Sequence, residues 1–113
     1  MRKIGIIQPN FLPWRGYFDF IQEVDAFVLL DDVQYTVQDW RNRNRIRTPS
    51  GGSAWLSVPT NGRQNDLILD VKLEPSLRWR RKHLSQLQHA YGKAPHFKRY
   101  FGPLSDPTHA FPI

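Results

Sequence analysis

Arginines at alternate positions mark one stretch of the sequence, WRNRNRIRTPSGG, which runs from Trp40 to Gly52. In an extended chain, side chains two residues apart share a face at a spacing of roughly 6–7 Å. Arginines at positions 41, 43, 45 and 47 would therefore present a row of forked donors suited to phosphate or carboxylate groups. The asparagines between the first of them are too polar for a buried sheet face. We expect a loop over residues 40–44 and a strand only over 45–48.

A second candidate binding segment follows the first aliphatic run, residues 3–8. The amides of Gln8 and Asn10 could hydrogen-bond a ligand at the carboxyl end of a strand, and Arg15 stands beside the expected start of a helix. The alternative is a loop that is stiffened by prolines and only turns the chain. The glycine-rich phosphate loops GxGxxG and GxxxxGK are both missing from the sequence.

Paired carboxylates follow the next apolar run, residues 26–30. If the two runs are parallel strands, Asp31, Asp32 and Gln34 leave the sheet at the same edge as the first loop and converge with it on one crevice. A carboxylate there could serve as a general base, metal ligand or ribose contact. Helix capping and loop hydrogen bonding are the structural alternatives.

These segments require a mixed α/β fold. Helical spacing over residues 17–24 completes a strand–helix–strand unit with a right-handed crossover. Residues 55–58 and 67–73 have the pattern of two strands, either an antiparallel hairpin or neighbours in the sheet, and we expect a mixed sheet. A long helix starts near Pro75-Ser76 and ends at Gly92. We expect one domain over residues 1–113, with an irregular tail over 95–113 in which Phe97, Tyr100, Phe101 and Leu104 could form one short helix.

Composition limits the function classes. Sixteen Lys and Arg against ten Asp and Glu give a net charge of +6 and a pI near 10.1, which favours anionic partners. The lack of cysteine excludes disulfides, thiolate zinc sites and cysteine nucleophiles. No apolar run has the length of a membrane span or a signal peptide, so we expect a cytoplasmic protein.

The histidines do not form a recognisable metal motif. His83 falls on the apolar face of the long helix, where a core role and a proton-transfer role are both open. His89 lies about 120° further around that helix, and His96 and His109 have no partner at a metal-binding spacing. We therefore expect no metal and no cofactor.

Four strings together resemble the WbqC-like family of bacterial proteins, whose members tend to be encoded among surface-polysaccharide and O-antigen biosynthesis genes. The strings are IGIIQPNFLPWRGYFDFI, VDAFVLLDDVQY, WRNRNRI and WLSVP, and the resemblance runs from about Ile4 to Tyr100. Family members are generally about twice as long, so the chain resembles their N-terminal half, as a truncated product would. Trp14 and Arg15 occupy positions where the family pattern is variable, which leaves Arg15 without family support.

The resemblance implies work on a nucleotide-linked sugar, with acyl or aminoacyl transfer to an amino sugar as one such task. The candidate residues are compatible with such an anionic small-molecule substrate: Arg41 and Arg43 could bind its pyrophosphate, and Asp32 or His83 could act as the base. The candidate catalytic residues are Asp32 and His83, and the candidate substrate-binding residues are Gln8, Asn10, Asp31, Gln34, Trp40, Arg41, Asn42, Arg43 and Asn44.

Three alternatives stay open. A basic nucleic-acid-binding module would suit the net charge and the aromatic residues, although the acids and amides in the distinctive strings count against it. A nucleotidyltransferase-like domain would begin with similar elements, but its His-x-Gly-His loop is missing. The third is a non-catalytic subunit of a glycan-biosynthesis complex.

Overall fold

The computed structural model describes residues 1–76 and 78–106, and the chain folds into two compact units. Unit 1 comprises Met1–Asn44 and Ser57–Glu74, and unit 2 comprises Arg45–Leu56 and the described chain from Pro75 onward. Strands and helices occur in both units, which confirms an α/β fold. The single domain expected over residues 1–113 stays a prediction.

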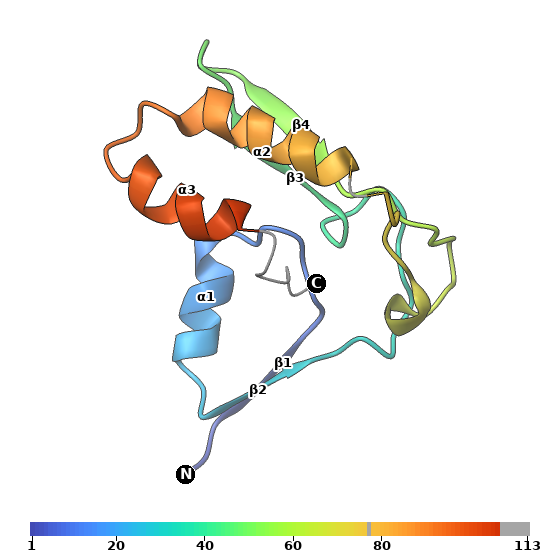
Figure 1. Cartoon of the computed structure of the whole chain (residues 1–113). Coiled ribbons are helices and arrows are strands. Elements are labelled where there is room, and N and C mark those ends of the chain that lie inside the picture. The colour runs from blue at the N-terminus through green and yellow to red at the C-terminus, as the bar shows by residue number, and fades with distance from the viewer. Residues whose placement is uncertain (77, 107–113) are drawn as a thin grey trace. The chain divides into compact units, whose positions relative to one another are not determined.

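In chain order the elements are β1 (Ile4–Ile7), α1 (Arg15–Gln22), β2 (Ala26–Leu29), β3 (Arg43–Arg47), β4 (Ser53–Ser57), the 3-10 helix η1 (Ile68–Asp70), α2 (Arg78–Tyr91) and α3 (Phe97–Ser105) (Figure 1).

The predicted strand–helix–strand unit opens unit 1. β1 and β2 pair in parallel, with Gly5 opposite Phe27. The ring of Phe27 meets those of Tyr17 and Phe20 edge to face, so α1 packs on this face of the sheet. A Cβ on Gly5 would lie 2.7 Å from the Phe20 ring, and glycine is therefore needed for the helix to approach the strand. All three elements lie within two residues of their predicted bounds.

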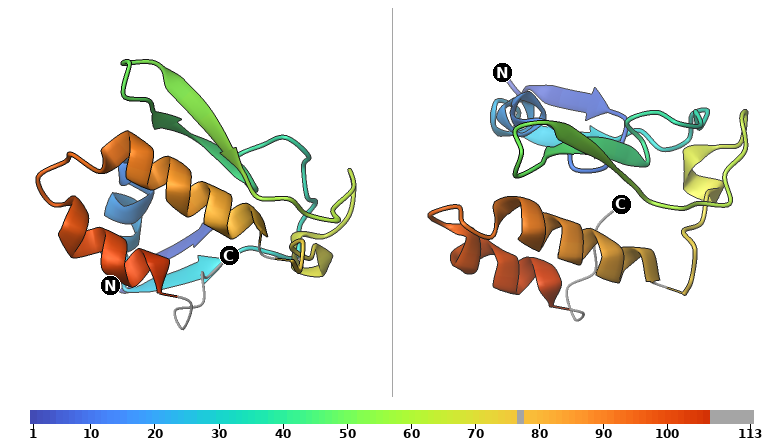
Figure 2. Two further views of the ribbon diagram at one scale, coloured as in Figure 1. Left: turned by 45° about the horizontal axis from the view of Figure 1, so that its top comes forward. Right: turned by 90° about the horizontal axis from the view of Figure 1, so that it is seen from above.

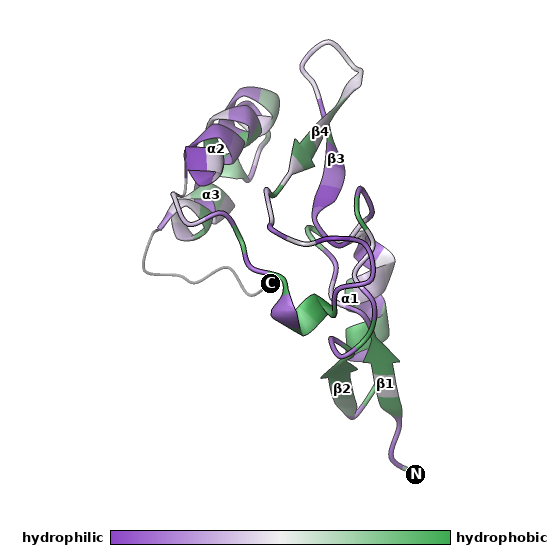
Figure 3. Ribbon diagram, turned by 90° about the vertical axis from the view of Figure 1, so that its right-hand side faces the viewer, coloured by the Kyte–Doolittle hydropathy of each residue, from purple (hydrophilic) through white to green (hydrophobic). Residues whose placement is uncertain are grey.

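The other face of this strand pair is apolar and exposed. β1 and β2 are hydrophobic along their length (Figure 3). Ile4 and Ile6 on β1 are 65% and 57% exposed, and Val28, opposite Ile6 on β2, is 45% exposed. No helix among the residues that the structure describes is long and apolar enough to cross a membrane.

β3 and β4 form an antiparallel hairpin, visible in Figure 2. Its ends are fixed by hydrogen bonds from Val58 N–H to the Asn42 carbonyl (2.7 Å) and from Thr48 N–H to the Gly52 carbonyl (3.0 Å). β3 starts at Arg43, so the loop predicted for residues 43 and 44 is wrong. β4 pairs with β3, whereas the sequence pattern predicts a pairing of residues 55–58 with residues 67–73.

The strand predicted over residues 67–73 is wrong. Its centre is η1, closed by the Asp70 N–H on the Leu67 carbonyl at 3.0 Å. Only single bridges remain on either side, Gln34 with Leu67 and Thr60 with Leu73. In a 3-10 helix the backbone N–H and C=O groups bond one another locally, so they do not pair with a neighbouring strand. The parallel and antiparallel pairs therefore lie in two separate sheets instead of one mixed sheet.

Unit 2 contains the long helix that the sequence predicts. Ser76 Oγ accepts a long hydrogen bond of 3.5 Å from the N–H of Arg78, the first residue of α2. At the other end, Gly92 N–H bonds the Gln88 carbonyl at 2.8 Å. A Cβ on Gly92 would lie 2.5 Å from that carbonyl oxygen, so a larger residue would clash at the predicted stop.

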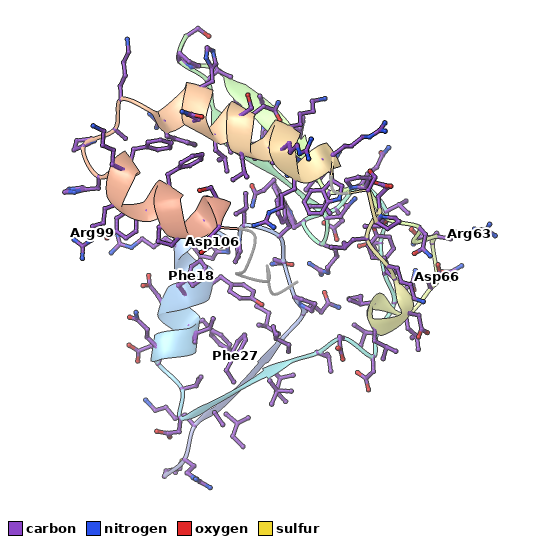
Figure 4. All side chains as sticks on the ribbon, viewed as in Figure 1. Phe18, Phe27, Arg63, Asp66, Arg99 and Asp106 are labelled. Atoms are coloured by element: carbon purple, nitrogen blue, oxygen red, sulfur yellow. The ribbon has the colours of Figure 1, made fainter. Side chains whose placement is uncertain are left out.

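α3 lies beside α2 in both views of Figure 2. It is the short helix that the apolar spacing in the tail predicts, and Phe97 and Phe101 stack on it with ring centroids 4.6 Å apart. Arg80 Nη2 on α2 donates to the carbonyl of Asp106, just after α3, at 2.8 Å; Figure 4 labels Asp106. The rest of the predicted tail, residues 107–113 with His109, lies outside the described residues.

Candidate functional site

Two sequence-distant segments of unit 1 meet just after β1 and just before β3. Phe11 N–H bonds the Trp40 carbonyl at 3.0 Å. Asn44 Nδ2 donates to the carbonyls of Leu12 at 2.7 Å and Phe11 at 3.3 Å. Leu12 has a φ of 45°, the left-handed region that leucine rarely occupies. The Asn44 amide therefore holds a strained loop, which explains why this polar residue belongs on β3.

A pocket of about 370 Å³ opens at this junction. Trp14 and Trp40 supply two indole rings to its wall, and Pro13 adds a third apolar surface. Asn10 and Asn44 supply the polar groups. Among residues 1–76 and 78–106, the lining therefore contains aromatic rings and amides but no charged side chain. Volumes of 300–1,000 Å³ with a few placed polar groups are typical of small-molecule sites.

Arg41 lies behind this wall. Its Nη1 donates to Asn10 Oδ1 and its Nη2 donates to Gln8 Oε1. Its Nε is buried and has no hydrogen-bond partner among the residues that the structure describes. The structure thus brings three predicted site residues together, but it directs both guanidinium tips to amide oxygens of the protein itself.

Tyr17 completes this network from α1. Its hydroxyl donates to the Gln8 carbonyl at 3.0 Å, and the side chain is 6% exposed. Burial raises the pKa of the Tyr17 phenol, and the positive charge of Arg41 opposes that rise in part. Tyr17 is therefore held neutral and fixes the backbone where β1 ends.

Asp39 anchors the other segment. Its Oδ2 accepts from Thr36 Oγ1 at 2.6 Å, and its Oδ1 accepts from the Trp40 N–H at 2.7 Å. These hydrogen bonds, Thr36 foremost, and the charges of Arg41 and Arg43 lower the pKa of the Asp39 carboxyl against the opposing effect of burial. Asp39 is thus ionised in the folded protein at neutral pH and orients the residue that carries one wall of the pocket.

The remaining members of the predicted arginine–asparagine set are built into the hairpin. Asn42 Nδ2 donates to the Val58 carbonyl at 3.1 Å, while its buried Oδ1 has no hydrogen-bond partner among the described residues. Arg43 is half-buried in β3. Asn42 therefore has a structural contact of its own, which explains how a polar residue is tolerated beside the sheet.

The carboxylates after β2 do not line this pocket. The parallel register does send both loops from one sheet edge, as predicted. However, Asp31 and Asp32 are exposed, and the Asp31 carbonyl accepts from the Leu69 N–H at 2.9 Å. Gln34 Nε2 donates to Asn65 Oδ1 at 2.9 Å. Their predicted roles stay predictions.

His83 belongs to unit 2. It is 8% exposed on α2, and its ring meets Trp79 edge to face with centroids 5.4 Å apart. This is the environment of a core histidine, and its catalytic role stays a prediction. No group of three His, Cys, Asp or Glu side chains that could hold a metal ion occurs over residues 1–76 and 78–106.

Sequence reasoning missed four residues of the site: Pro13, Trp14, Tyr17 and Asp39. Each stands in or next to a string that the resemblance quotes. Trp14 occupies a variable position of the family pattern, and nothing in its spacing predicts a pocket. The Thr36–Asp39 pair carries a local signal, because a hydroxyl three residues before a carboxylate is typical of a turn.

Comparison with known proteins agrees with the family that the motifs resemble. The model of the WbqC-like protein family matches residues 8–109, which include both segments of the pocket. The chain belongs to the WbqC-like protein family. This WbqC-like protein is 46% identical over 99 residues to uncharacterized protein Rv1507c of Mycobacterium tuberculosis (strain ATCC 25618 / H37Rv).

That match covers 86% of this WbqC-like chain but 42% of the mycobacterial protein. The chain thus spans less than half the length of the relative it matches. No solved structure matches it.

Proposed function

We propose that this WbqC-like chain binds the ring portion of a nucleotide-linked sugar in surface-polysaccharide or O-antigen biosynthesis. The reaction that follows is acyl or aminoacyl transfer to an amino sugar. The observation that carries the proposal is the neutral pocket lined by Trp14 and Trp40, with the amides of Asn10 and Asn44 beside the rings.

The lining suits a sugar or nucleobase ring. Indole faces bind planar bases by stacking and bind the C–H faces of other rings by dispersion and apolar burial. Amides supply the few directional hydrogen bonds that fix such a ring in place. A cavity of about 370 Å³ has room for one ring system with its substituents.

The net charge of +6 supports an anionic substrate, because a positive surface attracts a pyrophosphate before the ring docks. The phosphates need not enter the pocket. We assign them to cations outside its lining, such as Arg43, which directly precedes Asn44 in the sequence. A base for the amine is assigned to Asp32 or His83, the two candidate bases of the sequence analysis.

The test is calorimetric titration of the purified chain with UDP-, GDP- and dTDP-linked sugars at low and moderate salt. We expect one of these classes to bind, with an affinity that persists as salt rises because the ring contacts are uncharged. Trp40→Ala should weaken this binding by about 5- to 150-fold, since stacking on an indole is worth about 1–3 kcal/mol. Trp55→Ala, on β4 of unit 2, is the matched control and should not.

Short single-stranded DNA serves as the charge control in the same titration. Binding of DNA alone, with an affinity that collapses as salt rises, would replace the proposal with a basic nucleic-acid-binding module. Binding of neither ligand class would favour the non-catalytic subunit of a glycan-biosynthesis complex.

A further inference from the structure

We propose that Arg41 is a positioning residue for Asn10, and that Asn10 selects a ligand ring carrying an uncharged hydrogen-bond acceptor. The inference rests on the pocket of the proposed function and names what that pocket recognises. The expected acceptor is a hydroxyl or carbonyl oxygen of a sugar or nucleobase.

The orientation of the Asn10 amide follows from the chemistry of arginine. A guanidinium has five N–H donors and no acceptor, so the group that faces Arg41 Nη1 must be the Asn10 oxygen. The amide nitrogen of Asn10 therefore points away from Arg41. The one side-chain hydrogen bond of Asn10 among the described residues is the one its oxygen accepts from Arg41, and Asn10 lines the pocket. Its N–H donors are available to whatever fills that pocket.

Arg41 itself is poorly placed to bind the ligand. Its Nη1 and Nη2 are engaged by Asn10 and Gln8, and it is not among the residues that line the pocket. No carboxylate of the described chain lies within salt-bridge distance of it. A half-buried cation that contacts two neutral amides acts through their orientation, a role that differs from the pyrophosphate contact predicted for Arg41 from the sequence.

The neutrality of the lining determines which acceptor fits. A donated N–H from an amide binds hydroxyl and carbonyl oxygens well, whereas a phosphate inside an uncharged pocket would lose its hydration without a compensating cation. The pocket therefore recognises the ring, and the phosphates of the ligand remain outside it.

Two substitutions of matched chemistry separate this role from a structural one. Asn10→Asp keeps an oxygen for Arg41 and removes the N–H donors. Asn61→Asp makes the same change elsewhere in unit 1, at an amide whose Oδ1 accepts from the Lys72 N–H and which does not line the pocket. Both variants add one negative charge. We expect Asn10→Asp to bind about tenfold more weakly, and Asn61→Asp to bind within about twofold of wild type.

A double-mutant cycle tests the part assigned to Arg41. Arg41→Met should weaken binding several-fold in the wild-type background and have almost no effect in the Asn10→Ala background, because its effect passes through that amide. Melting temperatures of all variants are recorded in parallel. The melting temperatures show that each variant is folded under the assay conditions. A purely structural arginine would weaken binding by the same factor in both backgrounds, so the two substitutions would change affinity additively.

The probes are UDP-N-acetylglucosamine, GDP-mannose and dTDP-glucose, together with the nucleosides uridine, guanosine and thymidine. Equal affinity of Asn10→Asp and Asn61→Asp, or an additive cycle, overturns the inference and leaves the proposed function standing. Nucleoside binding that depends on Asn10, without any nucleotide-sugar binding, supports the inference and overturns the proposed function. If wild type binds none of the six probes, both are overturned.

Discussion

Arg41 and Arg45 stand four residues apart in one alternating string, yet they have different surroundings. Arg41 is half-buried and donates to the side-chain oxygens of Gln8 and Asn10 in unit 1. Arg45 is exposed in unit 2, where its guanidinium carbon lies 5.1 Å from the centre of the Trp55 ring. Arg41 links two segments of the pocket wall, whereas the guanidinium of Arg45 lies over the Trp55 ring of the hairpin. Identical spacing in sequence therefore does not imply a shared function.

The largest expected difference between the two is in stability. Arg41→Ala leaves the oxygens of Gln8 and Asn10 without their donor, and we expect the free energy of unfolding to fall by about 1–3 kcal/mol. Denaturant titration measures this loss. Equal losses for Arg41→Ala and Arg45→Ala would contradict the distinction between them.

A smaller loss of stability is expected at Tyr17 on α1, which extends the hydrogen-bond network of Arg41, Gln8 and Asn10. Tyr17→Phe keeps the buried ring and removes the hydrogen bond to the Gln8 carbonyl, which should cost about 0.5–1.5 kcal/mol. Tyr100→Phe is the control, because that side chain is 64% exposed and should change stability by less than about 0.5 kcal/mol. If the two tyrosines behave alike under the same denaturant titration, the network does not extend to α1.

The acid dependence of stability tests the other segment of the pocket wall. The pKa of Asp39 is lowered below its ordinary value of 3.8, so its ionised form stabilises the folded chain above that pH. This contribution is lost as the pH falls through the lowered pKa. Asp39→Asn should therefore lose less stability than wild type between neutral pH and strong acid.

Thr36→Val is the companion variant in that acid experiment. It removes the hydrogen bond that contributes most to the lowered pKa of Asp39, so it should flatten the acid dependence in the same direction as Asp39→Asn. Wild-type acid dependence in both variants would show that Asp39 does not anchor the wall.

The smallest effect is expected at the hairpin. Arg45→Ala should lower the free energy of unfolding by no more than about 0.5–1 kcal/mol, the worth of an exposed cation–π contact. The loss should disappear in the Trp55→Ala background, measured by the same denaturant titration. A larger loss in either background would mean that Arg45 has a role comparable to that of Arg41.

The sequence predicted the elements whose residues bury a regular face. β1, α1 and β2 follow from an aliphatic run, helical spacing and a second run, and α2 follows from its spacing with Gly92 as the stop. It failed where long-range hydrogen bonds decide the outcome. Asn44 is accepted in β3 because its amide reaches the carbonyls of Phe11 and Leu12, more than 30 residues away. Polarity alone assigned that residue to a loop.

The site was predictable only in part, because residue types can be read from the sequence and long-range hydrogen bonds cannot. Gln8, Asn10 and Arg41 were recognisable by residue type, and the structure brings them together. Their geometry was not recognisable, because only the fold shows that the guanidinium faces amide oxygens. Trp14 had no pattern of its own, since a pocket wall depends on the neighbour across it and carries no periodicity.

The most direct test of the ring-binding pocket is the indole N–H region of a two-dimensional NMR spectrum of the ¹⁵N-labelled chain. The four tryptophans divide evenly, with Trp14 and Trp40 in the pocket and Trp55 and Trp79 in unit 2. On addition of the nucleotide sugar that binds in calorimetry, we predict that the signals of Trp14 and Trp40 shift and the other two stay in place. Shifts confined to Trp55 and Trp79, or no shift at saturating ligand, would contradict the account.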